Sequence, residues 1–202
     1  ISENDKNFYK KYNDHIKKIF PFHSNQKVCS LPGKGNFILY HGNYNVSENY
    51  QSGLFLIDKI FSDCSFRLII AGANAYKKFS SKIQRYKNIE IVNNPTIHEM
   101  NLLIQEAHIN ILPAFQSAGI KLKLINSLYL GRHCLVNTKM LLPCPELKKL
   151  CVVCDSVEQF KKQIISLMNT PFSKEMNQIR TNILTKNFNN VQNASQMIDL
   201  MK

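Results

Sequence analysis

The stretch INILPAFQSAGIKLKLINSLYLGRHCLVN, residues 109–137, decides the fold of this chain. It begins with the apolar run Ile109–Leu112, which is typical of a buried strand, and a short loop follows. Gly119 opens a segment with helical periodicity that ends at Gly131, and residues 134–136 form a second apolar run. Strand, helix and strand in this order predict one β-α-β unit with two parallel strands.

The placement of two lysines in this unit is unusual. Lys121 and Lys123 fall in the first turn of the predicted helix, where the macrodipole disfavours a cation by roughly 0.3–1 kcal/mol. A bound phosphate or diphosphate would reverse that cost, because the free amides of a helix start and two ammonium groups together attract an anion. The two lysines therefore predict an anion site.

The same alternation continues on both sides of this unit. Further apolar strands are predicted at residues 37–40, 66–71, 89–92 and 152–153. Helices are predicted at residues 3–20, 48–61, 75–86, 97–106, 156–168, 174–186 and 191–201, with Thr96 and Glu99 forming a capping box. Strands that are continuously apolar are typical of a parallel sheet covered on both faces. We expect a doubly wound, Rossmann-like α/β domain, with the terminal helices wrapped around it.

Composition narrows the class of protein. The chain has 202 residues, of which 44% are hydrophobic, and no apolar run is long enough to cross a membrane. The first twenty residues are too polar for a signal peptide, and a start at Ile1 rather than Met suggests a fragment. A net charge of +12 suits an anionic partner such as nucleic acid, a membrane surface or a phosphorylated ligand. The abundance of Lys and Asn also fits a simple coding bias.

The cysteines and histidines predict no metal site. Cys151 and Cys154 form a CxxC pair inside an apolar run, and no second pair of zinc ligands accompanies them. The six histidines show no metal-binding spacing. We expect the six cysteines to be small buried core residues of a protein in a reducing compartment.

In an open parallel sheet, ligands bind at the carboxyl ends of the strands, so the loops there are the candidate site. Gly42, Gly72 and Gly119 lie in three of these loops and would let a ligand approach the backbone. Each glycine alone could simply end its strand, whereas three in equivalent positions favour a ligand. His41, at the end of the first strand, is a candidate ligand contact. The chain lacks GxGxxG, GxxxxGK[ST] and GxSxG, which argues against nicotinamide or flavin binding, P-loop chemistry and a nucleophile elbow.

Four segments carry a family resemblance: FILYHGNYNVSEN, RLIIAGANA, NIEIVNNPTIHEMNLLIQEAHINILPAF and GIKLKLINSLYLGRHCLVN. Over residues 36–188 the chain resembles the C-terminal half of a GT-B glycosyltransferase of the large retaining group called family 4 or group 1. The resemblance implies two Rossmann-like domains, of which the C-terminal one binds the nucleotide sugar. Residues 1–30 would then be the end of the N-terminal domain and the linker, and residues 31–202 the donor-binding domain.

The resemblance also implies site residues. Those for the donor and its diphosphate are Gly42, Asn43, Gly72, Ser117, Gly119, Ile120, Lys121, Lys123 and Asn126. The base is expected to meet backbone groups of Asn93 and Asn94. The chain departs from the family pattern, because Ala118 and Asn126 stand where the family has glutamates. Asn43 and Asn49 likewise replace the Arg and Lys that clamp the diphosphate. We hypothesise that Lys121 and Lys123 supply the missing positive charge.

The resemblance implies a hexosyl-type glycosyltransferase that uses a UDP- or GDP-sugar and a glycan or lipid-linked saccharide acceptor, without metal or cofactor. It would serve polysaccharide biosynthesis in the cytoplasm, with peripheral association at the inner face of the membrane. The catalytic side chains are expected in the N-terminal domain, so this chain alone would bind nucleotide without turnover. Two alternatives stay open. One is a GT-B-like epimerase or hydrolase, and the other is a non-catalytic basic module that binds nucleic acid or a protein.

Overall fold

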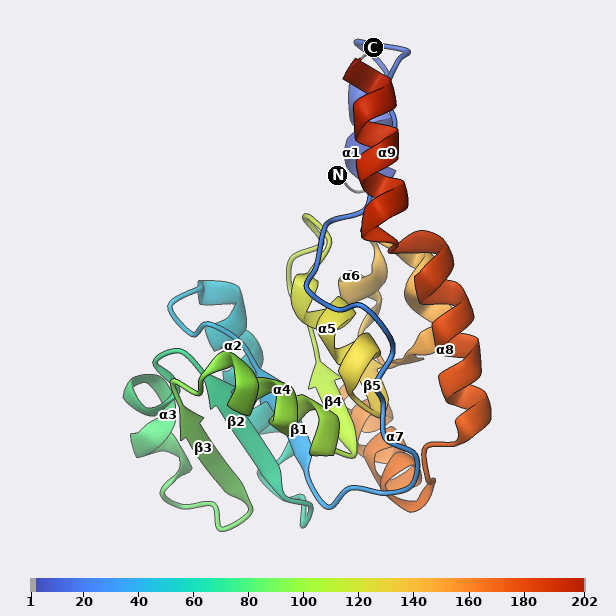
Figure 1. Ribbon diagram of the computed structural model, residues 1–202. Coiled ribbons are helices and arrows are strands. Elements are labelled where there is room, and N and C mark those ends of the chain that lie inside the picture. The colour runs from blue at the N-terminus through green and yellow to red at the C-terminus, as the bar shows by residue number, and fades with distance from the viewer. Residues whose placement is uncertain (1–2, 202) are drawn as a thin grey trace.

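A six-stranded parallel sheet forms the centre of the computed structural model, which describes residues 3–201. Its strands are β1 (Ile38–His41), β2 (Leu68–Gly72), β3 (Ile89–Asn93), β4 (Ile109–Leu112), β5 (His133–Val136) and β6 (Val152–Val153). They lie in the order β3-β2-β1-β4-β5-β6 (Figure 1), so the direction of winding reverses between β1 and β4. The predicted doubly wound α/β fold is confirmed, and each predicted strand is present within two residues of its expected position.

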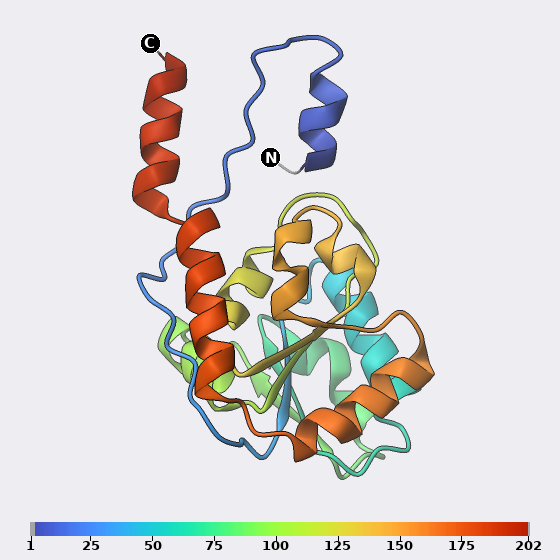
Figure 2. The same cartoon turned by 90° about the vertical axis from the view of Figure 1, so that its right-hand side faces the viewer.

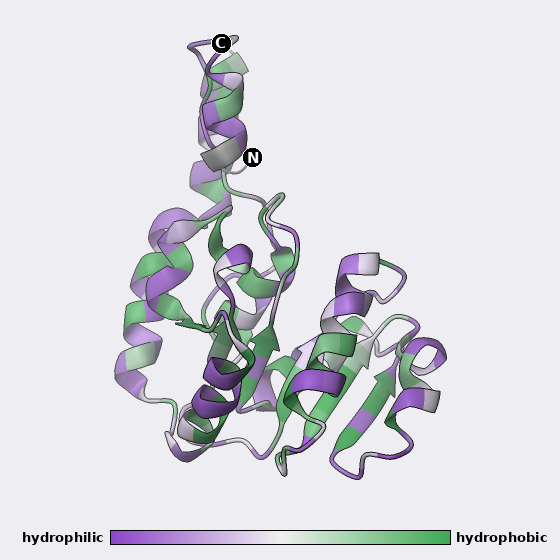
Figure 3. Ribbon diagram, turned by 180° about the vertical axis from the view of Figure 1, so that it is seen from behind, coloured by the Kyte–Doolittle hydropathy of each residue, from purple (hydrophilic) through white to green (hydrophobic). Residues whose placement is uncertain are grey.

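Burial explains why the strands are continuously apolar. Every residue of β1, β2, β4 and β5 is buried, since helices cover both faces of the sheet. The edge strand β3 mixes buried and exposed residues, and β6 is half-buried. Figure 3 shows the same contrast as hydrophobic ribbon in the sheet and hydrophilic ribbon on the outer helices.

Helices connect successive strands. Between β1 and β4 these are α2 (Ser47–Phe55) with a π-helical turn η1 (Leu56–Ile60), α3 (Ala75–Ile83) and α4 (Ile97–Glu106). After β4 come α5 (Leu122–Leu130), α7 (Val157–Asn169), α8 (Lys174–Asn187) and α9 (Asn190–Met201). The predicted capping box of Thr96 and Glu99 is present at the start of α4. Local capping chemistry therefore fixes where this helix begins.

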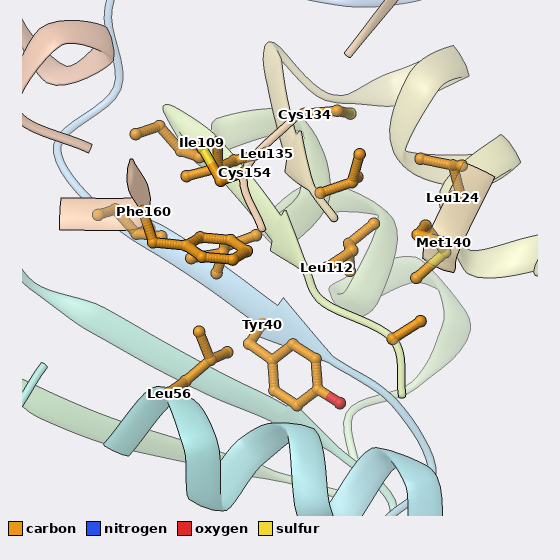
Figure 4. Packing of buried hydrophobic residues seen from close by; sticks show 14 of the residues in the cluster. Tyr40, Leu56, Ile109, Leu112, Leu124, Cys134, Leu135, Met140, Cys154 and Phe160 are labelled. Carbon is orange, nitrogen blue, oxygen red and sulfur yellow. The ribbon is translucent and has the colours of Figure 1, made fainter. Parts of the chain in front are cut away.

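The main core includes apolar residues on both faces of the sheet. Tyr40 of β1, Leu56 of η1 and Phe160 of α7 belong to it on one face, and Leu112 of β4 belongs to it on the other face, which α5 covers; each of these residues is at most 2% exposed (Figure 4). A smaller cluster centres on Ile104 of α4, which packs against apolar residues of β1 and β2. The two clusters hold the loops at the carboxyl edge of the sheet in place.

The ends of the chain differ from the prediction. The first helix, α1 (Glu3–Tyr9), stops well before residue 20, because a turn follows Tyr9 and the chain then becomes extended. We call residues 15–30 the strap, which runs along α5 and α8 (Figure 1) and is hydrogen-bonded to Asn126 and Arg180 of these helices. The predicted wrapping by the terminal helices holds only for α8. Figure 2 shows α9 standing clear of the sheet, and Asn193 is its one buried residue among those described.

Two short elements between β5 and β6 were not predicted. They are α6 (Thr138–Leu141) and the 3-10 helix η2 (Pro145–Leu150). Neither is long enough to show an apolar periodicity in the sequence, and α6 depends on capping of the Met140 amide by the Asn137 side chain.

All six cysteines are free thiols. Cys134, Cys144 and Cys154 are buried, as predicted, whereas Cys29, Cys64 and Cys151 are half-buried. In the CxxC pair, Cys154 is buried and Cys151 is half-buried, which agrees with a role of the pair in the core.

Candidate functional site

A pocket of about 340 Å³ opens at the carboxyl ends of β1 and β2, next to the start of α5. We call it the switch-point pocket, because it lies beside the reversal between β1 and β4, the place where open α/β sheets bind their ligands. It is lined by His41, Gly42, Asn43, Gly72, Ala73, Pro95, Thr96, Ile97, Met100, Asn101, Ile104, Lys123 and Asn126. The sequence-predicted Gly42, Asn43, Gly72, Lys123 and Asn126 thus come together in one cavity.

Close backbone packing requires glycine in this pocket. A Cβ atom at Gly72 would overlap the carbonyl oxygen of Gly42, and Gly72 has a φ of 146°. A Cβ at Gly42 would lie 3.0 Å from the side chain of Asn49. These two glycines let the loops after β1 and β2 touch each other, which shapes the wall of the pocket.

Lys123 is the cation that lines the switch-point pocket. Its Nζ donates to Asn49 Oδ1 at 2.8 Å and lies 5.2 Å from the centre of the Tyr40 ring. Asn49 in turn donates to the carbonyl oxygen of Asn43 at 3.0 Å, so the loop after β1 positions the lysine. Burial lowers the pKa of Lys123 to about 8. Asn49, at the family's lysine position, thus holds a lysine that another helix supplies.

Lys121 does not line the switch-point pocket. It is the N-cap residue of α5, and its Nζ lies 3.0 Å from Glu48 Oε2 in a pair whose side chains are 17% and 10% exposed. Glu48 Oε1 also accepts from the amide of Gln116 at 3.1 Å. A carboxylate from α2 therefore already neutralises Lys121, and of the two lysines predicted to form the anion site, Lys123 is the one that lines the pocket.

His41 and Asn126 contribute polar groups without charge. His41 Nε2 lies 3.1 Å from Ser127 Oγ, and burial lowers the pKa of His41 to about 3, so its ring is neutral at physiological pH. Asn126 Oδ1 accepts from Asn25 Nδ2 of the strap at 2.8 Å. The amide nitrogen of Asn126 makes no hydrogen bond within the part of the chain that the structure describes, and it remains free for a ligand.

Asn93 and Asn94, whose backbone groups were predicted to bind the base, are not among the residues that line the pocket, and their side chains are used elsewhere. Asn93 Oδ1 accepts from the amide of Tyr76 at 2.9 Å, and Asn94 Oδ1 accepts from the amide of Asn74 at 2.8 Å. Both asparagines therefore brace the start of α3. The first residues of α4 line the pocket in their place, and sequence reasoning missed them.

Ser117, Gly119 and Ile120 belong to the loop between β4 and α5 and also lie outside the lining of the pocket. Gly119 has a φ of 67°, and a Cβ there would meet open space, so the loop needs glycine for its backbone conformation. Within residues 3–201, no group of three or more His, Cys, Asp or Glu side chains is placed to hold a metal ion.

Comparisons with known proteins place this fold among glycosyltransferases. The chain is similar to TarM (TM-score 0.66, 10% identity, 92% of this chain and 39% of TarM). It is also similar to a mutant of S. aureus TarM in complex with fondaparinux, α-GlcNAc-glycerol and UDP (TM-score 0.71, 10% identity, 99% of this chain and 42% of that one). A third similar structure is a UDP-forming trehalose-phosphate synthase from Burkholderia xenovorans with glucose-6-phosphate (TM-score 0.61, 9% identity, 84% and 44% coverage).

These likenesses identify the fold as a Rossmann-like half of the GT-B type. The chain spans about two-fifths of the length of these solved proteins, between 39% and 44%. No protein-family model and no curated protein sequence matches it. None of the structures described here supports the alternative of a basic binding module. No helix among the described residues is long and apolar enough to cross a membrane.

Proposed function

We propose that this chain is the donor-binding half of a glycosyltransferase that moves a hexosyl group from a nucleotide sugar to an acceptor. One observation carries the proposal: Lys123 presents a half-buried ammonium group to a pocket at the switch point of a GT-B-type sheet. Oxygen atoms of a diphosphate would bind there to the ammonium group and to the free amides at the start of α5.

The same contacts would assist sugar transfer. Negative charge grows on the diphosphate as its bond to the sugar breaks, so a fixed cation and fixed amides stabilise the transition state more than the ground state. The free amide of Asn126 would donate to a hydroxyl of the donor. The nucleobase would lie against Thr96, Ile97 and Met100 at the start of α4, instead of against Asn93 and Asn94.

Groups that activate the acceptor are proposed to lie in another part of a longer protein. This view is supported by the finding that the chain spans only 39% and 44% of the length of two similar structures. A second domain would contribute the opposite wall of the active site. We expect the chain alone to bind a UDP- or GDP-sugar without transferring it. A glycan or lipid-linked saccharide acceptor, and work at the cytoplasmic face of a membrane, belong to the same proposal.

Calorimetric titration with UDP and GDP tests the proposal. Saturable one-site binding is expected, and Lys123→Met should weaken it by at least about tenfold through loss of a charge-assisted contact. Lys77→Met is the matched control, because it removes an exposed lysine of α3 that does not line the switch-point pocket. Equal affinities for wild type and Lys123→Met would refute the site. Binding of oligonucleotides with a steep salt dependence, and none of nucleotides, would instead support the basic module.

A further inference from the structure

A second pocket lies where the strap crosses α5 and where α8 gives way to α9, a region visible at the α8–α9 junction in Figure 2. Its volume is about 350 Å³, within the range of small-molecule sites. We call it the amide pocket. It is lined by Asn25, Gln26, Tyr129, Thr185, Phe188, Asn189, Asn190 and Val191.

The lining of the amide pocket carries no ionisable acid or base near neutral pH, although the chain as a whole has a net charge of +12. A charged ligand would lose its hydration there without an ion-pair partner. Carboxamides and a threonine hydroxyl dominate the lining, and these groups both donate and accept hydrogen bonds. The chemistry therefore suits a neutral ligand that has many groups of mixed donor and acceptor character.

Several of these polar groups have no partner within the described residues. Asn25 uses its amide nitrogen on Asn126, which leaves its carbonyl oxygen free. Asn189 accepts from two amides at the start of α9, which leaves its NH₂ group free. The side chains of Gln26 and Thr185 make no hydrogen bond in the part of the chain that the structure describes. Donors and acceptors thus face one cavity from both the strap and the α8–α9 turn.

Other contacts hold the walls of this pocket in place. The Tyr129 ring packs on the His23 ring at 4.6 Å, and the Phe188 ring packs on the Phe20 ring at the same distance. Asn190 binds the backbone of His23 through both ends of its amide, at 3.3 Å and 2.7 Å. The polar groups are therefore attached to a fixed aromatic floor, which reduces the entropy lost on binding.

We infer that the amide pocket binds a neutral saccharide. Each sugar hydroxyl donates and accepts, matching the free carboxamide and hydroxyl groups that line the pocket. The pocket also adjoins the switch-point pocket, since the hydrogen-bonded pair Asn25–Asn126 has one member in each lining. As a docking point for a glycan chain, the assignment rests on the proposed function.

Titration of the chain with maltotriose, cellotriose and triacetylchitotriose, followed by amide chemical shifts, tests this inference. We expect saturable, millimolar binding of at least one trisaccharide, with shifts centred on the strap and the α8–α9 turn. The double variant Gln26→Leu/Thr185→Val removes polar groups that have no structural partner, so it should fold and bind about tenfold more weakly. Gln196→Leu is the matched control, because it makes the same change on the exposed part of α9 outside the pocket.

Two results would overturn the inference: no saturable binding of any of the three trisaccharides, or equal binding by wild type and the double variant. Titration with UDP on the same samples separates this inference from the proposed function. Lys123→Met should lose UDP binding and keep trisaccharide binding, because Lys123 lines only the switch-point pocket of the two. Trisaccharide binding without any nucleotide binding would keep the amide pocket and refute the donor site.

Discussion

The buried charge of Lys123 destabilises the free protein but would bind an anionic ligand in a complex. Burial lowers its pKa to about 8 from an ordinary value of 10.5, so its charge is held at the expense of stability near neutral pH. Among its direct contacts in the described residues are a neutral amide oxygen and an aromatic face, and its nearest acid, Glu48, is already paired with Lys121. An anion in the switch-point pocket would supply the missing counter-charge.

This pKa predicts how nucleotide affinity depends on pH. Lys123 is charged below about pH 8 and loses its proton above it, whereas UDP stays fully ionised at its phosphates over this range. Affinity for UDP should therefore fall as pH rises through about 8, by up to about tenfold at one unit above the pKa. Calorimetry at several pH values measures the profile. It should become flat in Lys123→Met, and a flat profile in the wild type would contradict the assignment.

At the scale of elements, the Glu48–Lys121 pair joins the first turn of α2 to the start of α5. Glu48 also accepts from the amide of Gln116, so one carboxylate holds both the middle and the end of the loop between β4 and α5. The side chains are largely buried, and loss of one partner would leave the other charge poorly compensated. We propose that the pair orders the loop at the edge of the switch-point pocket.

A double-mutant cycle tests this role. Glu48→Gln should lower the free energy of unfolding by about 2 kcal/mol, and Lys121→Met added to it should lower it little further, giving a coupling energy of about 1–2 kcal/mol in urea unfolding. The Arg67–Glu90 pair is the control, because its side chains are 44% and 49% exposed. Its coupling should stay below about 1 kcal/mol. Additive effects of the Glu48 and Lys121 changes would contradict the role.

The elements also show what the sequence could and could not predict. The strands and the Thr96 capping box were predictable, since apolar runs and cap residues act over a few neighbouring positions. The contact of Lys121 with Glu48 joins residues 73 positions apart, so no local sequence pattern predicts it. The apolar spacing that predicted a helix to residue 20 describes instead a short helix and the extended strap. Base binding by the backbone of Asn93 and Asn94 stays a prediction, whereas the use of their side chains at the start of α3 could not be predicted from the sequence.

At the scale of the whole molecule, Arg180 of α8 ties three distant segments together. Its guanidinium donates to Ser30 Oγ of the strap at 2.8 Å, to the carbonyl oxygen of Gly131 and to that of Arg132 at 2.6 Å. The residue is 2% exposed and packs over the ring of Phe172 at 4.6 Å. The strap, the end of α5 and α8 thus share one buried set of hydrogen bonds.

Arg180→Met should keep the volume of the side chain while it leaves two buried carbonyl oxygens without a partner. We expect a loss of about 3 kcal/mol in urea unfolding and faster tryptic cleavage at Lys27 in the strap. Lys186→Met on the exposed side of the same helix should change stability by less than about 0.5 kcal/mol. If Arg180→Met were as stable as the control, with unchanged cleavage of the strap, Arg180 would not be what holds the strap, α5 and α8 together.

The distribution of thiols has a practical consequence. Burial raises the pKa of Cys64, Cys134, Cys144, Cys151 and Cys154, which slows their alkylation because the thiolate is the reactive form. Cys29 lies half-buried in the strap, away from the sheet, and its Sγ donates a weak hydrogen bond to the carbonyl oxygen of Lys27. The sequence therefore offers an attachment point in the strap for a fluorophore or spin label. A probe there would sit three residues from Gln26 and report on the strap without any engineered cysteine.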